Sequence, residues 1–266
     1  MTSYDSFLLD AVAFAHEAGK IQLQYFRKGN FDITAKQNDF DIVTTADKAS
    51  EMAVKSGILS KYPLHHAILS EESGLSQSGS AQPEFEWVID PLDGTTNFSA
   101  GLPNFNVSIG LRHHGQTVVG VVFAPYLNEL FHAVKGEGAY LNGEPITTSK
   151  KTSLSQAVVA TGFPYDKATT TDNNLDNVTR VMPQVRGLRR IGSAALDISY
   201  VAAGFLDGYW EINLHEWDVC AAELIATEAG ATVCRFRTDR NVSLLAAAPG
   251  IEPQLSALIS TTPPQP

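Results

Sequence analysis

The sequence predicts a layered fold of helices and sheets, α+β in its first half and α/β in its second. Apolar residues near the N-terminus recur at three- and four-residue steps, the period of an amphipathic helix. The middle of the chain instead alternates apolar and polar residues, which is typical of strands. Helices and strands in both halves favour alternating layers. We therefore expect a single domain over residues 1–266, with an N-terminal half of residues 1–150 and a C-terminal half of residues 151–266.

Two helices are predicted before the first strands. The first covers residues 4–25, where the apolar side chains from Tyr4 to Tyr25 keep a helical period. The second covers residues 46–62 and is stopped by Pro63, which cannot continue a helix. The strands that follow form an antiparallel meander. They are expected at residues 67–70, 87–89, 105–111, 117–124 and 130–134.

The second half of the chain mixes strands with helices. Helices are predicted at residues 193–203 and 219–229, and each is ended by a glycine, Gly204 or Gly230. Residues 73–83, rich in Ser, Gly and Gln, are expected to form an exposed loop, and residues 261–266 a frayed tail. Strands are predicted at residues 157–161, 208–212, 231–235 and 244–248.

The composition excludes several classes of function. A net charge of −10 disfavours nucleic acid or an anionic membrane as a partner, because both attract basic surfaces. Cys220 and Cys234 form neither a disulfide framework nor a zinc signature, and no secretory signal precedes the first helix, so a reducing cytoplasm is expected. If the substrate is a phosphate ester, bound divalent metals would supply the positive charge that this acidic protein lacks.

The strongest local signal is residues 90–97, DPLDGTTN, directly after a short apolar strand. The proline interrupts sheet pairing and Gly94 permits a sharp turn, after which Thr95 or Thr96 can cap a helix. Two carboxylates, Asp90 and Asp93, therefore lie beside free backbone N–H groups. Carboxylates collect hard divalent metals, and free N–H groups at a helix start bind phosphate oxygens. An ordinary Asx-type turn is the alternative interpretation.

Further acids lie at strand ends or helix starts. Glu71 and Glu72 close a short strand, where the pair is either solvated or neutralised by a cation. Asp47 and Asp218 lie at helix starts, and Asp218 can serve there as an N-cap or bind a metal. Glu211 ends a strand and is either on the surface or facing a pocket. Because α/β proteins gather their sites at such positions, we expect these acids to meet.

Taken together, these motifs resemble the inositol monophosphatase family of metal-dependent, lithium-sensitive sugar phosphatases. The resemblance covers nearly the whole chain. It implies a five-layer α-β-α-β-α sandwich and a homodimer. The motifs that carry it are WVIDPLDGTTNF at residues 87–98, WDVCAA at 217–222 with EAG at 228–230, and shorter matches at 39–47, 69–72, 141–143 and 192–195.

The resemblance also implies roles for the matching residues, with two or three Mg²⁺ ions in one site. Asp90 would bridge two of the ions, and Thr95 with Asp47 would orient the attacking water. The implied catalytic residues are Asp47, Glu71 and Thr95. The implied metal ligands are Glu71, Asp90, the carbonyl of Leu92, Asp93 and Asp218. The implied contacts to phosphate and alcohol are Leu92, Asp93, Gly94, Thr95, Ser193, Ala194, Glu211 and Asp218.

The implied reaction is hydrolysis of myo-inositol monophosphate or a similar small phosphorylated polyol by metal-activated water. Alternative activities within the superfamily are 3′(2′),5′-bisphosphate nucleotidase, histidinol-phosphatase and fructose-1,6-bisphosphatase. The alternative outside the enzymes is a regulatory binding protein on this scaffold, as for bacterial relatives that contact the transcription machinery. One departure is the C-terminal edge at residues 232–237, where many relatives carry a second glycine and a longer, glycine-rich turn.

Two pairs of adjacent histidines suggest zinc as another possibility. Residues 65–66 and 113–114 lack the i, i+4 spacing of a helical zinc site, and no nearby acid completes one. We therefore expect both pairs to be ordinary surface residues. The glycines at residues 136 and 138 do not form a P-loop, because no Gly-Lys-Ser/Thr follows them.

Overall fold

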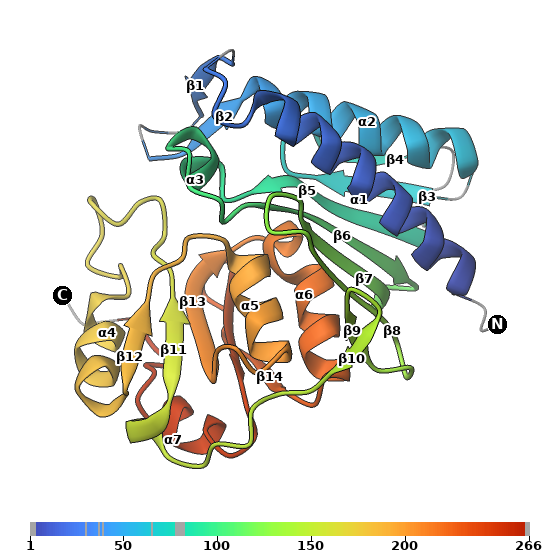
Figure 1. The fold of residues 1–266 in the computed structure, drawn as a ribbon. Coiled ribbons are helices and arrows are strands. Elements are labelled where there is room, and N and C mark those ends of the chain that lie inside the picture. Colours follow the sequence, from blue (N-terminus) through green and yellow to red (C-terminus); the bar gives the residue numbers. More distant parts are fainter. Residues whose placement is uncertain are drawn as a thin grey trace.

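The structure, a computed structural model, describes residues 4–29, 31–36, 38, 40–64, 66–77 and 83–263. Its elements stack in five layers, so the predicted α-β-α-β-α sandwich is confirmed (Figure 1). Three pairs of helices alternate with an eight-stranded and a five-stranded sheet. The pairs are α1 (Asp5–Tyr25) with α2 (Thr45–Lys61), α5 (Ala194–Ala202) with α6 (Glu216–Glu228), and α4 (Leu175–Val181) with α7 (Glu252–Ser256).

The larger sheet has the strand order β10-β9-β8-β7-β6-β5-β3-β4. The neighbours from β5 to β10 are antiparallel, which confirms the meander for the predicted strands from residue 87 onwards. The prediction for the strand at residues 67–70 needs correction, because β3 pairs with β5 in parallel. β4 pairs with the other edge of β3 in antiparallel. β4 (Gly74–Gln77) lies within the stretch predicted to be a loop, and residues 78–82 of that stretch fall outside the described residues. The other strands are β3 (His66–Ser70), β5 (Phe85–Asp93), β6 (Asn106–His113), β7 (Gln116–Ala124), β8 (Glu129–Val134), β9 (Ala139–Leu141) and β10 (Glu144–Ile146).

The smaller sheet has the order β12-β11-β13-β15-β14. Its strands follow the predicted ones with ends shifted by one or two residues. Short elements with too few residues to show a period escaped prediction, including β12, α4, α7 and the separate pair β1 (Ile33–Ala35) and β2 (Ile42–Thr44). The strands are β11 (Val158–Thr161), β12 (Gly187–Arg189), β13 (Gly208–Leu214), β14 (Thr232–Arg237) and β15 (Val242–Ala247).

Helix α6 lies against the larger sheet at a very short distance. A Cβ added to Gly120 of β7 would lie 2.5 Å from the carbonyl oxygen of Ala221, and one added to Gly110 of β6 would lie 2.5 Å from the Cys220 sulfur. Larger side chains at these glycines would therefore push the helix away from the sheet. The contact fixes α6 between the two sheets, and with it the acid near its N-terminus (Figure 1).

Two predicted helix starts need correction. α6 begins at Glu216 with His215 as its N-cap, so Asp218 is the third helical residue rather than the cap. Asp47 holds the same position in α2, where Thr44 is the N-cap. In both helices the aspartate carboxylate accepts a hydrogen bond from the backbone N–H of the cap, as in a capping box.

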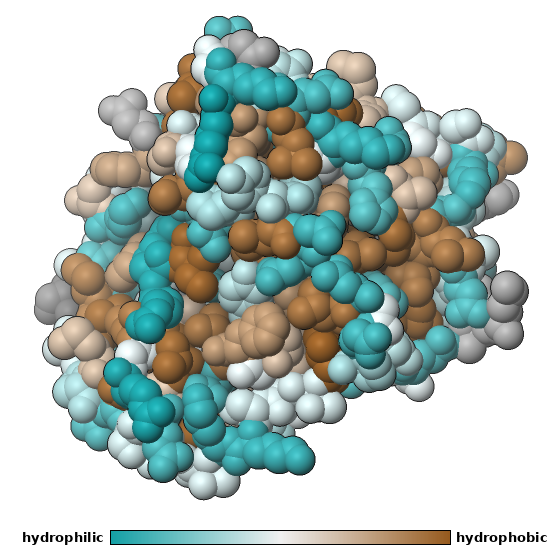
Figure 2. All heavy atoms as spheres, in the orientation of Figure 1, coloured by the Kyte–Doolittle hydropathy of each residue, from teal (hydrophilic) through white to brown (hydrophobic). Residues whose placement is uncertain are grey.

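The surface turned to the viewer in Figure 2 carries hydrophilic and hydrophobic residues in interspersed groups. Within the described part of the chain, no helix is both long enough and apolar enough to cross a membrane.

Candidate active site

The predicted acids meet in a cavity of about 220 Å³ at the carboxyl end of β5. Elements from both halves of the chain contribute to it, including β5, β13 and the N-terminal ends of α5 and α6. Asp47 lies behind this lining and reaches it through Thr95. The predicted residues that line the cavity are Glu71, Asp90, Leu92, Asp93, Gly94, Thr95, Ser193, Ala194, Glu211 and Asp218. Asp39, at the start of one matching motif, falls outside the described residues.

The turn that carries Asp90 is held by backbone contacts. β5 was expected to end at Asp90, but it continues to Asp93 with a shift of register between these two residues. The backbone N–H of Leu92 donates to Asp90 Oδ1 at 3.0 Å, and Gln22 Nε2 donates to the Pro91 carbonyl at 2.8 Å. These contacts let a proline sit inside a buried strand without leaving its neighbours unsatisfied.

Gly94 and Thr95 start the short helix α3 (Thr95–Ser99). Gly94 occupies the N-cap position, not a threonine as predicted. Its φ of 90° favours glycine, and a Cβ there would lie 2.7 Å from the Asn104 carbonyl oxygen. Thr95 Oγ1 lies 2.9 Å from Asp47 Oδ1 and 3.0 Å from the Leu92 carbonyl oxygen. The threonine hydroxyl is therefore fixed at the cavity wall.

Asp47 is fully buried and its position is fixed by several donors. Its Oδ2 accepts hydrogen bonds from Thr44 N at 2.9 Å and Thr44 Oγ1 at 2.5 Å, while Oδ1 accepts the hydrogen bond from Thr95. Burial raises the pKa of Asp47, and these hydrogen bonds oppose that rise by stabilising the carboxylate.

Asp93 connects the cavity to the start of α5. Its Oδ2 accepts hydrogen bonds from Ser193 Oγ at 2.7 Å, Ala195 N at 2.9 Å and Asn106 Nδ2 at 3.1 Å. Burial and the neighbouring carboxylate of Asp218 nevertheless raise the pKa of Asp93 to about 6. Asp93 therefore sets the position of Ser193, the N-cap residue of α5.

Like charges crowd the remaining acids. The pKa of Asp90, which is 2% exposed, is raised well above its usual value by burial and by Glu71, Asp93 and Asp218. Burial raises the pKa of Glu71 to about 7, although Lys36 opposes the rise. Buried carboxylates that repel one another need a cation to be ionised together.

Lys36 supplies a positive charge to this group. Its Nζ lies 2.7 Å from Glu71 Oε1 and 2.6 Å from Glu72 Oε1. The pair of glutamates is therefore neutralised in part by a cation, one of the two possibilities that the sequence left open. Lys36 itself was not predicted, because it belongs to the short β1–β2 segment and gives no local signal.

The sequence left open whether Glu211 lies on the surface or faces a pocket, and in the structure it faces the cavity. Its carboxylate accepts a hydrogen bond from the Tyr209 hydroxyl, and burial raises its pKa to about 7. A Cβ at Gly162 would lie 2.0 Å from Glu211 Oε2, so glycine there leaves room for the carboxylate in its observed position. Arg190 and Asp197, which sequence reasoning missed, also line the cavity, and Arg190 stabilises the charge of Glu211.

The segment after β11 was also missed, although residues 163–165 line the cavity. The pKa of the Tyr165 hydroxyl is raised well above its usual value, first by burial and then by nearby acids, of which Glu71 contributes most. The same segment contacts the chain on the other side of the cavity, since Lys167 Nζ lies 4.3 Å from the centre of the Phe40 ring.

Two arginines of the C-terminal β14–β15 hairpin hold this segment. Arg237 Nη1 and Nη2 donate to the Asp172 carboxylate at 2.8 and 2.6 Å, and Arg237 is only 5% exposed. Arg240 Nη2 donates to Asp166 at 2.7 Å, and Arg240 Nη1 donates to the Asp172 carbonyl at 2.8 Å. The bidentate, buried pair of Arg237 with Asp172 and the more exposed bond of Arg240 to Asp166 fix the course of the segment that follows the cavity-lining residues 163–165.

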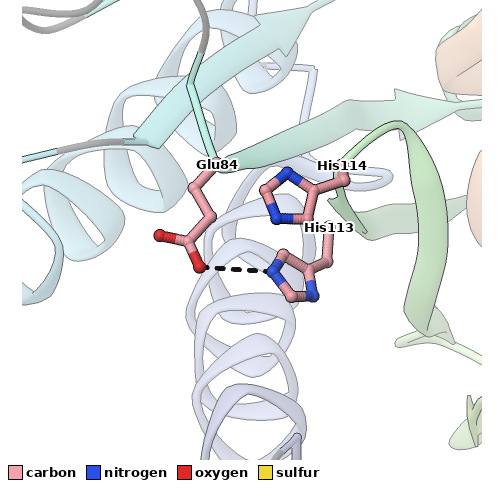
Figure 3. Close-up of side chains that lie close together, drawn as sticks. All are labelled: Glu84, His113 and His114. Carbon is pink, nitrogen blue, oxygen red and sulfur yellow. Dashed lines mark hydrogen bonds and ion pairs between the residues drawn. The ribbon is translucent and has the colours of Figure 1, made fainter.

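The histidine pairs need one correction. Residue 65 falls outside the described residues, and His66 is half-buried, accepting a hydrogen bond from Trp87 Nε1 at 3.0 Å. His113 and His114 lie near an acid, contrary to our expectation, because Glu84 Oε1 is 3.2 Å from His113 Nε2 (Figure 3). The sequence did not reveal this contact, because Glu84 and His113 are far apart along the chain. The antiparallel pairing of β5 and β6 brings them together.

Comparisons with known proteins agree with the motifs. The model of the inositol monophosphatase family matches residues 4–261. Nus factor SuhB of Pasteurella multocida is 43% identical over 246 residues, 91% of each chain. The inositol monophosphatase structure from Anabaena has a TM-score of 0.86 and 38% identity, covering 99% of this chain and 98% of that one. Extragenic suppressor protein suhB from Bartonella henselae has a TM-score of 0.87 and 33% identity, covering 96% and 98%. The chain therefore belongs to the inositol monophosphatase family and shares its layered fold.

Proposed function

We propose that this member of a phosphatase family is a Mg²⁺-dependent phosphomonoesterase that hydrolyses myo-inositol monophosphate or a similar small phosphorylated polyol. The observation that carries the proposal is the group of four acids, Glu71, Asp90, Asp93 and Asp218, around one cavity. Beside them lies a threonine whose hydroxyl is fixed by a buried aspartate. The names of the relatives, inositol monophosphatase and SuhB, agree with this class of enzyme.

The donor set fits Mg²⁺. Carboxylate and carbonyl oxygens are the ligands that hard divalent ions prefer, and the raised pKa values of Glu71, Asp90 and Asp93 indicate repulsion that a cation relieves. When bound, the metal ions neutralise phosphate oxygens and lower the pKa of bound water. We expect two or three ions, held by Glu71, Asp90, the Leu92 carbonyl, Asp93 and Asp218.

Thr95 and Asp47 position the attacking water in our proposal. The hydroxyl of Thr95 donates to Asp47 Oδ1, which leaves lone pairs of Thr95 Oγ1 to accept a hydrogen bond from water. A threonine hydroxyl is a poor base alone, so the proton of the water is drawn towards Asp47 through Thr95. Glu71, directly after the neighbouring strand β3, completes the proposed catalytic set. The N–H groups of Gly94 and Thr95 supply donors for the phosphate oxygens.

Glu211 and the start of α5 bind the alcohol in this proposal. Glu211 is an acceptor for polyol hydroxyls, and Ser193 and Ala194 line the same cavity. Arg190 offers a donor and offsets the charge of Glu211. A polyol can engage the acceptor Glu211 and the donor Arg190 with separate hydroxyls at the same time.

The bisphosphate nucleotides, histidinol phosphate and fructose 1,6-bisphosphate remain the alternative substrates. The name Nus factor SuhB, carried by a relative at 43% identity, favours a regulatory role as a second candidate function. We also propose that the protein is cytoplasmic and forms a homodimer.

A phosphate-release assay with Mg²⁺ tests the proposed function. We expect release from myo-inositol monophosphate in Mg²⁺ and none in excess chelator, because the acids hold no phosphate without cations. The alternative substrates and glycerol 2-phosphate form the comparison panel. Full hydrolysis in chelator contradicts the metal-dependent proposal, and no hydrolysis of any ester leaves the regulatory role.

Thr95→Ala should lower kcat by about 100-fold or more, the usual contribution of a positioned proton acceptor. Mg²⁺ affinity should stay near wild type, because the threonine acts on the water. Thr96→Ala is the matched control, since Thr96 is exposed and lies next in the same helix. Calorimetry with Mg²⁺ and rate measurements separate the two effects. Equal loss of rate and affinity would show that Thr95 is structural.

Glu211→Gln should raise KM for myo-inositol monophosphate by about 10- to 100-fold, the worth of a charged hydrogen bond. KM for glycerol 2-phosphate should change little. Lithium inhibition should stay near wild type, because we propose that lithium occupies the metal position made by Asp90, Asp93 and Asp218, which does not include Glu211. The assays are run near pH 8, where the carboxylate is ionised. Equal changes of KM for both substrates would show that Glu211 does not bind the alcohol.

In excess chelator, the free energy of unfolding of the metal-free protein should fall as the pH rises from about 5 to about 8. The folded pKa values of Glu71 and Glu211, about 7, and of Asp93, about 6, lie above those of unfolded acids. Such groups stabilise the folded state while protonated and lose that contribution as they ionise. The raised pKa of His215 acts in the same direction.

Urea denaturation at several pH values, with chelator and with Mg²⁺, measures how the free energy of unfolding changes with pH. Mg²⁺ should remove most of the fall, since it binds the ionised acids of the folded state. The double variant Glu71→Gln, Glu211→Gln should show a smaller fall in chelator. If the free energy of unfolding in chelator instead rises over this pH range, the proposed repulsion between the buried carboxylates is wrong.

A further inference from the structure

A second group of metal-binding side chains lies at the end of the larger sheet opposite the acids. Glu84 directly precedes β5, whose nine residues run to Asp93 in the cavity. At about 3.3 Å per residue the two ends of this strand are roughly 30 Å apart. His113 ends β6, and His114 begins the turn to β7. This group is therefore separate from the proposed catalytic site.

One donor atom from each of these three residues lies within 4.8 Å of the others (Figure 3). Glu84 Oε1 and His113 Nε2 are 3.2 Å apart. His114 has a φ of 49°, which turns its ring onto that of His113 with centroids 4.4 Å apart. Consecutive residues of an extended strand point to opposite faces, so the left-handed backbone of His114 is what brings both imidazoles to one side.

The ring of His113 is held in a binding orientation by its surroundings. Tyr4 Oη lies 2.8 Å from His113 Nδ1, and the Phe85 ring stacks on the other face at 4.5 Å. The hydrogen bond with Tyr4 engages one ring nitrogen and leaves the other facing Glu84. Metal-binding histidines commonly use a hydrogen bond at the second nitrogen in this way.

We propose that Glu84, His113 and His114 bind one transition-metal dication of the Zn²⁺ class. Two imidazole nitrogens and one carboxylate oxygen suit Zn²⁺, with water as the fourth ligand, whereas Mg²⁺ prefers oxygen ligands alone. Zn²⁺ holds its ligands about 2.0–2.1 Å away, so tetrahedral donor atoms lie about 3.3 Å from one another. Glu84 and His113 already have this spacing, and the exposed His114 closes the site by turning its side chain.

The bound ion would tie together separate parts of the chain. Glu84 belongs to the segment before β5, the histidines to the β6–β7 turn, and Tyr4 precedes α1. Lys135 and Glu228 line a hollow next to the histidines, and their opposite charges largely offset each other there. The ion would therefore stabilise this end of the sheet and take no part in phosphate hydrolysis.

The test counts bound Zn²⁺ in the full chain with Mg²⁺ in excess, by equilibrium dialysis. Because Zn²⁺ also enters carboxylate sites, the readout is the difference between variants. His114→Gln and Glu84→Gln should each bind one Zn²⁺ fewer than wild type. His16→Gln, which removes a histidine outside the group, should bind the wild-type number.

Two further measurements distinguish a metal site from a plain ion pair. Co²⁺ should give the intense visible absorption of a tetrahedral site in wild type, lost in His114→Gln. Zn²⁺ should raise the thermal midpoint of wild type by about 5 °C at saturation and that of His114→Gln by less. Both effects should weaken as the pH is lowered, because protons compete with the metal ion for the imidazole nitrogens. Equal Zn²⁺ counts in wild type and both site variants, or a Co²⁺ spectrum unchanged by His114→Gln, would overturn the proposal and leave only an ion pair.

Discussion

The structure depends on keeping several buried carboxylates close together. Asp47, Asp93 and Asp218 solve this in the same way, because each accepts a backbone N–H at the start of a helix. The N-terminal end of a helix carries partial positive charge and unsatisfied donors, so it stabilises a carboxylate there. Helices α2, α5 and α6 thus aim their N-terminal ends at one cavity, and this arrangement determines how the layers stack.

Small residues make that arrangement sterically possible. Gly110 and Gly120 let α6 approach the larger sheet, which places Asp218 opposite Asp90 and Asp93 across the cavity. Gly162 performs the equivalent task on the smaller sheet by leaving space for Glu211. The requirement for glycine at these positions is a packing requirement, since none of the three has a positive φ.

The sequence predicted the features that depend on local pattern. The long helices, the meander and the motif at residues 90–97 were found because period, turn residues and strand ends are local properties. The N-cap role that was one alternative for Asp47 and for Asp218 belongs instead to Thr44 and His215, each three positions upstream of its aspartate. Lys36, Tyr165 and the contact of Glu84 with His113 escaped entirely, since each acts through a partner far along the chain.

The difference between local motifs and contacts between distant parts of the chain also matters for substrate specificity. The acids and the threonine lie in the local motifs that carry the family resemblance, within the part of the chain that the family model matches. Residues 163–165 line the cavity, and the segment directly after them is held through Asp166 and Asp172 by Arg240 and Arg237 of the β14–β15 hairpin. A buried bidentate ion pair costs desolvation and gains specificity of position, so its presence here indicates that the segment must follow one course. We infer that the choice of alcohol is set where this hairpin supports that segment, because a shift of this cavity wall would change which hydroxyls fit, while the proposed metal ligands would stay in place.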